Sequence, residues 1–378
     1  MLRRTVVTAI SVALVLVFVL GCSSSAPASS PSPSSSPPPS SPATSASSQP
    51  QASPKPSESP KAPPPPATVR VGLINSATDA PTLIAMEKGY FKEQGITIQP
   101  EIFDSASRMI PPLASGQLDV GAGGVSAGLF NSIVSGVPVK AVATKGDLLK
   151  GAGALMVKKE MLDSGRLKDY KDLKGMKIAI NASKNTTHFN ISQAIRKGGL
   201  TDDDVTLNEI PFPQIVTALS NGSIDVGWLI EPYITIAKEQ GMVIWHLGED
   251  YLEYAGGSLV LLYAPHFWQK QDEVGKRFMV AYVKGVRDYI DAMWKKKANR
   301  EDVIQILMQK TPMKDRALYD KMTPITYHQD ALVDRKAIAA NQDWYLERGY
   351  QTQKVDLNTV IDDSYTDYAL KILGPYKE

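Results

Sequence analysis

Two stretches, ASGQLDVGAGGVSAG at residues 114–128 and SNGSIDVGWLIEPY at residues 220–233, carry the same short pattern. In each copy an apolar helical pattern ends at a glycine that suits a left-handed helix C-cap, and a short apolar strand follows. Five matches in register indicate one structural unit that is used twice. With a displacement of 106 residues (219 − 113), the matched pairs are Leu113 and Leu219, Gly116 and Gly222, Asp119 and Asp225, Val120 and Val226, and Gly121 and Gly227.

The segments upstream of the two copies also correspond. Short β-rich runs at residues 69–74 and 176–180 are each followed by a polar loop and a helical pattern. Both halves therefore predict the order β-α-β-α-β, which favours an α/β fold of mostly parallel sheets flanked by helices. Because ligands of such sheets bind at the carboxyl ends of the strands, we expect two lobes that face each other across a cleft.

Two apolar runs with glycines nearby, residues 152–158 and 256–263, are expected to carry the chain between the lobes. They suit a pair of hinge strands, and ordinary sheet strands are an equally open interpretation. Lobe 1 is thus predicted from residues 68–153 and 259–378, and lobe 2 from residues 154–258.

Beyond the second crossing, apolar residues recur at three- and four-residue spacing, which predicts helices. The residues that carry this pattern are Met279, Tyr282, Val283, Val286, Ile290 and Met293. Large aromatic residues among these helices are interpreted as core rather than as a binding site: Tyr289, Trp294 and Trp344.

The N-terminal region is predicted to be an export signal followed by a tether. Arg3 and Arg4 precede an apolar run that ends at Gly21, which is typical of a signal peptide over residues 1–21. The run is shorter than a membrane-spanning helix requires. Residues 22–67 are mostly Ser, Pro and Ala, a composition that cannot form a core and indicates a disordered linker.

Cys22 is the only cysteine of the chain, which excludes an intramolecular disulfide and a cysteine zinc site. The run VLGC at residues 19–22 resembles a bacterial lipobox. This resemblance implies a lipoprotein with palmitate-type acyl chains on Cys22, anchored at the extracytoplasmic face of the cell membrane. Without the signal peptide, the basic count falls to 41 − 2 and equals the 39 acidic residues, so no basic field favours nucleic-acid binding.

Three segments together resemble the substrate-binding proteins of ABC importers: AMEKGYFKEQGITI at 85–98, LASGQLDVG at 113–121 and DVGWLIEPY at 225–233. The family includes binders of nitrate, taurine, aliphatic sulfonates and thiamine pyrimidine precursors. The resemblance implies a two-lobe periplasmic-binding-protein fold of type II that closes on one small molecule and delivers it to a membrane permease, with the ATPase on other chains. We expect a monomer without enzymatic activity, cofactor or metal, whose closure is a population shift toward the liganded state.

The loops that follow the strands supply the candidate ligand-binding residues. Glycines let backbone N–H groups approach a ligand, hydroxyl and amide groups donate hydrogen bonds, and aromatic faces stack on flat molecules. In lobe 1 the candidates are Asn75, Asp79, Ser105, Gly124 and Ser126. In lobe 2 they are Asn185, Thr186, Thr187, Phe212, Trp228, Glu231 and Tyr233.

Several candidates have a structural alternative that the sequence leaves open. Asp79 is placed to cap a helix, and Glu231 precedes Pro232 at a helix start. The polar run at 181–189 suits a solvated loop or an N-cap, and His188 within it is expected to be structural. The aromatic candidates are also compatible with inter-helix or core packing: Phe212, Trp228 and Tyr233.

The type of ligand is predicted from the charges and rings near these loops. The cationic side chains near these loops are Arg108 and Lys184. A site for a small anion would be expected to contain an Arg side chain that donates two parallel hydrogen bonds, or a cluster of donors, so the scarcity of cations weakens the case for such a site. The aromatic candidates therefore favour a planar vitamin-like heterocycle such as riboflavin or a thiamine pyrimidine precursor. A small anion such as nitrate, taurine or an aliphatic sulfonate is the alternative.

A rival from the enzyme class is a pyrimidine-precursor synthase, because fungal synthases of this kind resemble the predicted fold. The export signal counts against this rival, since such chemistry draws on intracellular cofactors. The sequence also lacks the His-Glu-x-x-His, Gly-x-Ser-x-Gly and P-loop motifs.

Overall fold

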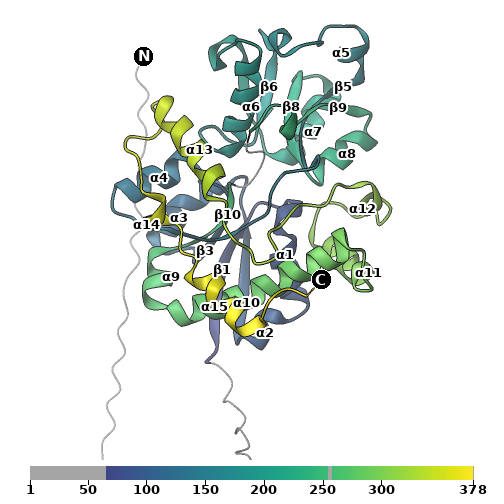
Figure 1. Cartoon of the computed structure of the whole chain (residues 1–378). Helices are drawn as coiled ribbons and strands as arrows, with labels where there is room; N and C mark the ends of the chain where they lie inside the picture. Colours follow the sequence, from purple (N-terminus) through teal and green to yellow (C-terminus); the bar gives the residue numbers. More distant parts are fainter. Residues whose placement is uncertain (1–64, 254–257, 378) are drawn as a thin grey trace, which may run out of the picture. The chain divides into compact units, whose positions relative to one another are not determined.

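The repeated pattern builds two five-stranded sheets in the computed structural model, which describes residues 65–253 and 258–377 (Figure 1). The first sheet contains β1 (Ala67–Leu73), β2 (Ile96–Ile102), β3 (Val120–Gly124), β4 (Lys140–Thr144) and β10 (Leu259–Tyr263). The second contains β5 (Gly153–Lys158), β6 (Lys177–Ile180), β7 (Thr206–Glu209), β8 (Val226–Ile230) and β9 (Met242–Leu247). The signal peptide, the linker and Cys22 lie outside the described residues.

The two sheets have the same topology. Their strand orders are β2-β1-β3-β10-β4 and β7-β6-β8-β5-β9. In the first sheet β10 runs antiparallel to both of its neighbours, and in the second β5 does so, while the other four strands of each sheet share one direction. The predicted α/β fold of two mostly parallel sheets is therefore confirmed, and both predicted crossing runs contribute a sheet strand. The sequence patterns did not predict the last strand in each order, which is β4 in the first sheet and β9 in the second.

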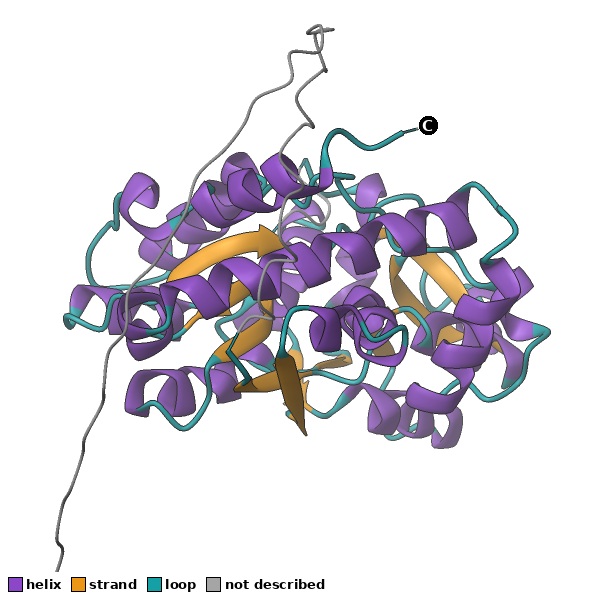
Figure 2. Ribbon diagram, turned by 90° about the horizontal axis from the view of Figure 1, so that it is seen from below, coloured by secondary structure: helices purple, strands orange, loops and turns teal. Residues whose placement is uncertain are grey.

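Helices lie above and below the strands in the view of Figure 2. Those of the first half are α1 (Ala80–Glu87), α2 (Tyr90–Glu93), α3 (Ile110–Ser115), α4 (Ala127–Val134), α5 (Lys159–Asp163), α6 (Thr186–Lys197), α7 (Phe212–Asn221) and α8 (Tyr233–Glu239). Those of the second half are α9 (Pro265–Lys270), α10 (Asp272–Tyr289), α11 (Arg300–Lys310), α12 (Leu318–Lys321), α13 (Arg335–Glu347), α14 (Leu357–Val360) and α15 (Ser364–Leu373). Across the described ranges, none of the helices has the length and apolar character needed to cross a membrane.

The predicted C-terminal helical pattern forms the buried side of α10. This helix packs against α1, α2 and α15, and it continues into a π-helical turn at Ile290–Trp294. The predicted apolar residues are all buried: Met279, Tyr282, Val283, Val286, Ile290 and Met293. Tyr289 and Trp344 are buried as well, and the partly buried Trp294 donates its indole N–H to the Ile325 carbonyl at 2.8 Å.

The repeated glycines at the helix ends have the same conformation in both copies. α3 ends at Gly116 and α7 at Gly222, each with φ of 78°. This left-handed conformation reverses the chain toward the next strand, and glycine adopts it without the steric cost of a Cβ. The predicted C-caps are confirmed.

The repeated aspartates hold the start of the neighbouring strand. The Asp119 carboxylate accepts the backbone N–H of Arg70 in β1 at 2.7 Å. The Asp225 carboxylate accepts the backbone N–H of Lys177 in β6 at 2.9 Å. Both aspartates precede the central strand of their sheet, so each one fixes its register at the amino edge, away from the carboxyl ends of the strands.

The second glycine of each copy lets a helix approach the central strand closely. A Cβ at Gly121 would lie 2.8 Å from Cδ1 of Leu113, and a Cβ at Gly227 would lie 2.6 Å from Cγ2 of Ile215. Real Cβ atoms do not approach neighbours so closely, so only glycine permits this spacing between helix and sheet.

Replacing Gly227 with alanine is expected to destabilise the fold by overpacking. Because the added methyl group collides with Ile215 on α7, the free energy of unfolding of Gly227→Ala should fall by about 1–3 kcal/mol in urea denaturation. Gly128→Ala is the matched control, since its site is exposed on α4 and a Cβ there meets only Ser126 Oγ at 3.7 Å. An unchanged stability of Gly227→Ala would contradict this account of the repeat.

Candidate ligand-binding site

Loops that follow the carboxyl ends of strands in the first sheet contact the corresponding loops of the second sheet. We call this region the interlobe seam: residues 74–79, 103–106, 125–126, 181–185 and 231–233, which follow β1, β2, β3, β6 and β8. Ala77 N–H donates to the Glu231 carbonyl at 3.0 Å, and the Tyr233 hydroxyl donates to the Asn75 carbonyl at 2.8 Å. The Asn181 amide donates to the Asp104 carbonyl at 3.3 Å. The seam is therefore joined by direct hydrogen bonds between residues of the two halves.

The starts of α4 and α6 face each other across the seam. Ser126 caps α4 by accepting the Leu129 N–H at 3.2 Å, and Asn185 caps α6 by accepting the His188 N–H at 3.1 Å. The two cap residues also form an antiparallel bridge, in which Ala127 N–H donates to the Lys184 carbonyl at 2.9 Å. Both candidates thus lie at the seam and act as N-caps, which is the structural alternative that the sequence offered for Asn185.

Small side chains let the lobes approach at this point. The Thr186 hydroxyl donates to the Val125 carbonyl at 3.2 Å. A Cβ at Gly124 would lie 2.8 Å from Thr186 Oγ1, so a larger residue would hold the two loops apart. The neighbouring candidate Thr187 lies in the first turn of α6 with 8% of its surface exposed.

A buried ion pair between Lys145 and Asp79 lies beside the seam, and only Asp79 is among the candidates predicted from the sequence. Lys145 Nζ lies 2.6 Å from Asp79 Oδ1, and both side chains are 1% exposed. The other carboxylate oxygen of Asp79 accepts the backbone N–H groups of Ile74 at 3.2 Å and Ser76 at 3.0 Å. Burial lowers the pKa of Lys145, and the Asp79 carboxylate acts in the opposite direction.

Lys145 follows β4, the strand that the sequence prediction lacks. The signal that points to it is the run VKAVATKG at residues 139–146, in which a short apolar strand ends at Thr144 and Lys145. The cations that the sequence pointed to are different. Arg108 and Lys184 are both exposed, and the Lys184 ammonium lies 5.2 Å from the centre of the Tyr350 ring.

Ser105 carries a buried hydroxyl without a hydrogen-bond partner among the described residues. It follows β2, is 1% exposed and stands at the N-cap position of the 3-10 helix Ala106–Met109, yet its side chain makes no capping bond. Buried hydroxyl groups are nearly always paired. Ser105 is therefore the candidate whose side chain the protein itself leaves unsatisfied.

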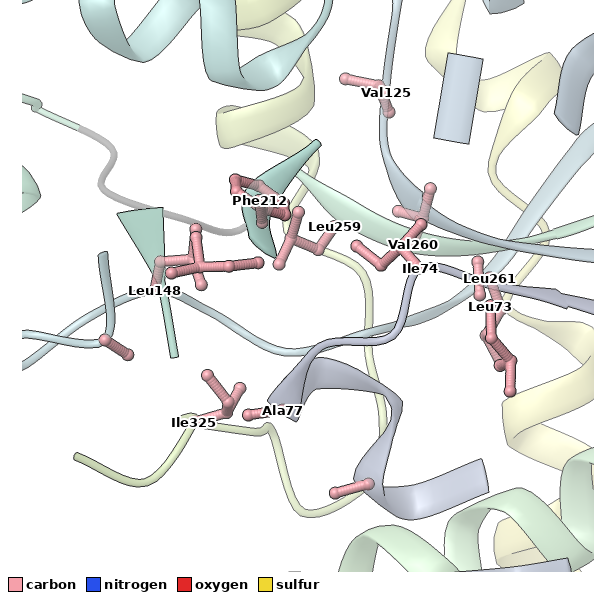
Figure 3. Packing of buried hydrophobic residues seen from close by; sticks show 14 of the residues in the cluster. Leu73, Ile74, Ala77, Val125, Leu148, Phe212, Leu259, Val260, Leu261 and Ile325 are labelled. Atoms are coloured by element: carbon pink, nitrogen blue, oxygen red, sulfur yellow. The ribbon is translucent and has the colours of Figure 1, made fainter. Parts of the chain in front are cut away.

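The aromatic candidates pack against protein groups. Phe212 and Tyr233 stack on each other with ring centres 5.9 Å apart, and Phe212 belongs to the buried cluster drawn in Figure 3. Trp228 is 1% exposed and fills the space over Gly153 and Gly248, where a Cβ would lie 3.0 Å from its ring. The packing alternative that the sequence left open thus describes Trp228, which packs against β5 of its own sheet and the turn after β9.

Glu231 is buried at the seam, and its carboxylate contacts the first turn of α8. Its carboxylate accepts the Thr235 N–H at 3.1 Å, the Thr235 hydroxyl at 3.0 Å and the Thr323 N–H at 3.2 Å. This contact set is the helix-start alternative that the sequence offered. Burial raises the pKa of Glu231 to about 7, although the three hydrogen bonds act in the opposite direction.

The raised pKa of Glu231 predicts a loss of stability with rising pH. Between about pH 4.5 and 7 the folded protein keeps a proton that the unfolded chain releases, so the free energy of unfolding falls by about 3 kcal/mol over this window. Glu231→Gln should lack this contribution, and urea denaturation at several pH values measures the difference. Glu160→Gln, at an exposed site, should follow the wild-type slope. Parallel profiles for wild type and Glu231→Gln would contradict the assignment.

The sequence and the fold have counterparts in known proteins. A model of the NMT1-like family matches residues 62–308. The chain belongs to the NMT1-like family. A Bacillus subtilis (strain 168) protein named for binding aliphatic sulfonates is 27% identical over 311 residues, which is 80% of this chain and 88% of the relative. The taurine-binding periplasmic protein of Escherichia coli (strain K12) is 27% identical over 224 residues, covering 59% and 67%.

The solved structure of a similar protein shows the same fold. The periplasmic nitrate-binding protein of Synechocystis PCC 6803 superposes with a TM-score of 0.63 at 14% identity, covering 82% of this chain and 90% of that one. The predicted resemblance to the substrate-binding proteins of ABC importers and the predicted periplasmic-binding-protein fold are therefore confirmed.

Proposed function

We propose that this protein is the solute-binding component of an ABC importer, which captures a small anionic or anion-bearing solute of the nitrate, taurine or sulfonate type and delivers it to a membrane permease. The observation that carries the proposal is the meeting of α4 and α6, one from each lobe, start to start at the seam. Helix N-termini present N–H groups and a partial positive charge, which favours anions. Lys145 adds a buried cation at the carboxyl end of β4.

This proposal replaces the interpretation that the ligand is riboflavin or a thiamine pyrimidine precursor, which the comparisons do not support. That interpretation depended on aromatic faces turned toward a flat ligand. Phe212 and Tyr233 instead stack on each other, and Trp228 packs over Gly153 and Gly248. The anion alternative agrees with the names of the relatives, which are sulfonate, taurine and nitrate binders.

Binding is proposed to work by closure of the two lobes around the solute. The proposed lobe boundaries are 68–153 with 259–378, and 154–258, so the chain crosses at the first residue of β5 and just before β10. A solute that contacts both lobes binds the closed state more tightly and shifts the population toward it. The protein is proposed to act as a monomer and to make or break no covalent bond.

The test is a binding panel on the purified full chain. Nitrate, taurine and ethanesulfonate are titrated by isothermal calorimetry, alongside riboflavin and a thiamine pyrimidine precursor, and mass spectrometry of each mixture reports any turnover. We expect a saturable heat with at least one of the three anion-bearing probes and none with the two heterocycles. Binding of a heterocycle alone, or chemical conversion of any probe, would overturn the proposal.

The proposed location is the extracytoplasmic face of the cell membrane, with lipid on Cys22. Replacing Cys22 with serine removes the thiol that carries the lipid, so Cys22→Ser should move from the membrane pellet to the soluble extracytoplasmic fraction. Ser23→Ala is the matched control and should stay in the pellet. A Cys22→Ser protein that remains with the membranes contradicts the anchor and leaves the solute-binding role in place.

A further inference from the structure

A pocket of about 370 Å³ lies outside the interlobe seam. Its walls come from the turn at residues 149–152, which leads into β5, and from residues 293–300 and 319–324, at the start of α11 and around α12. The charged residues that line it are three cations and one acid, namely Lys150, Lys296, Arg300 and Asp320. The charges of the lining therefore sum to +2.

Two of the three cations have no carboxylate partner among the described residues. The Lys150 ammonium lies 4.6 Å from the centre of the Trp294 ring. The ammonium of the exposed Lys296 forms no ion pair or hydrogen bond within the part of the chain that the structure describes. Arg300, in contrast, pairs with Asp320 at 2.7 Å. The excess positive charge of the pocket therefore belongs to Lys150 and Lys296.

The acids around the pocket are already engaged by other groups. Their contacts are Asp320 with Arg316 at 2.5 Å, Glu301 with Arg316 at 2.9 Å, Asp291 with Lys297 at 2.9 Å, and Glu249 with the Gly151 N–H at 3.4 Å. Asp147, three residues before Lys150, is partly buried and engaged as well. Within the described ranges, none of these acids neutralises Lys150 or Lys296.

Both lysines occupy positions where the backbone favours glycine or asparagine. Lys150 has φ of 56° in a turn that the Ala152 N–H closes by donating to the Leu149 carbonyl at 3.2 Å. Lys296 has φ of 51° and follows the π-helical turn by two residues. Non-glycine residues rarely adopt this conformation, and asparagine tolerates it better than lysine does. Backbone preference therefore does not account for lysine at either position, whereas a shared anionic ligand does.

The size and walls of the pocket indicate the class of that ligand. Two unpaired ammonium groups match a phosphate monoester, which carries a charge of about −1.5 to −2 at neutral pH. Trp294 provides an apolar wall, and its ring is held in place because the indole N–H donates to the Ile325 carbonyl at 2.8 Å. Small-molecule sites have volumes of about 300–1,000 Å³, so this pocket has room for an organic substituent beside the phosphate.

We propose that this pocket binds a phosphate group that carries an organic substituent, with Lys150 and Lys296 as counter-ions and Trp294 as the apolar wall. A small soluble ester and a phospholipid headgroup both present this chemistry. The site is additional to the solute site, because the residues that line it are different from those of the interlobe seam. The proposal therefore goes beyond the proposed function and does not depend on it.

The first experiment separates the two sources of phosphate. Glycerol 3-phosphate is a soluble ester, and dihexanoyl phosphatidic acid carries the same phosphate together with two short acyl chains. Each is titrated into the full chain by isothermal calorimetry in a phosphate-free buffer. We expect a saturable heat that weakens at high salt, because both ammonium groups are exposed to solvent ions. Binding of both probes assigns the site to soluble esters, and binding of dihexanoyl phosphatidic acid alone assigns it to a lipid headgroup.

Substitution of the two lysines should weaken this binding without unfolding the protein. Lys150→Asn combined with Lys296→Asn removes both charges and places a residue that suits the backbone, so the dissociation constant should rise about fivefold or more while the melting temperature does not fall. The two single variants repeat the comparison separately. Lys92→Gln combined with Lys336→Gln is the matched control, since it removes the same charge from exposed sites on α2 and α13 and should leave the dissociation constant unchanged.

The outcomes that contradict the proposal are distinct. Absence of heat with both phosphate probes, or an unchanged dissociation constant in the folded lysine variants, would overturn it. Equal weakening in the matched control would show only a general attraction of anions to the protein and would also refute the site. Loss of nitrate, taurine or ethanesulfonate binding in the double asparagine variant would place the two lysines in the solute site instead. Failure of the solute panel alone overturns the proposed function and leaves this inference standing.

Discussion

The close approach of a helix to the central strand of each sheet is the constraint on which the rest of the structure depends. α3 crosses Gly121 and α7 crosses Gly227 at a spacing that no Cβ tolerates. The aspartate of the same pattern holds the first strand at the amino edge. With the amino edge fixed in this way, the loops at the carboxyl edge are free to differ, and they provide the surface on which the two halves meet.

The repeat explains why the fold could be predicted from the sequence and the site only in part. Matching glycines and aspartates at a fixed displacement identify two copies of one unit, and the strand direction follows from the helices between them. β4 has no counterpart of the repeated glycines and aspartates, and it offers only three apolar residues, Ala141, Val142 and Ala143. Its signal in the run VKAVATKG is therefore weak, and the burial of the Lys145 that follows it is visible only in the structure.

Burial of a charged side chain depends on a partner that local sequence does not identify. Lys145 and Asp79 lie far apart in the chain, yet the parallel order of the sheet brings the ends of β1 and β4 to one edge. The direction of an aromatic side chain is equally hidden. Trp228 follows the repeated motif directly, but the pleat of β8 turns it toward Gly153 of the same sheet and toward Gly248.

The hydrogen bonds that hold the seam closed are made between protein groups alone. They therefore cannot distinguish one solute from another. Ala77 with Glu231, and Tyr233 with Asn75, form neutral hydrogen bonds that each contribute only about 1 kcal/mol and are the same for every solute. A solute shifts the lobe equilibrium only by the difference in its interaction with the closed and open states. Selection among solutes of similar size therefore has to come from groups that a solute contacts directly, rather than from the hydrogen bonds that hold the lobes together.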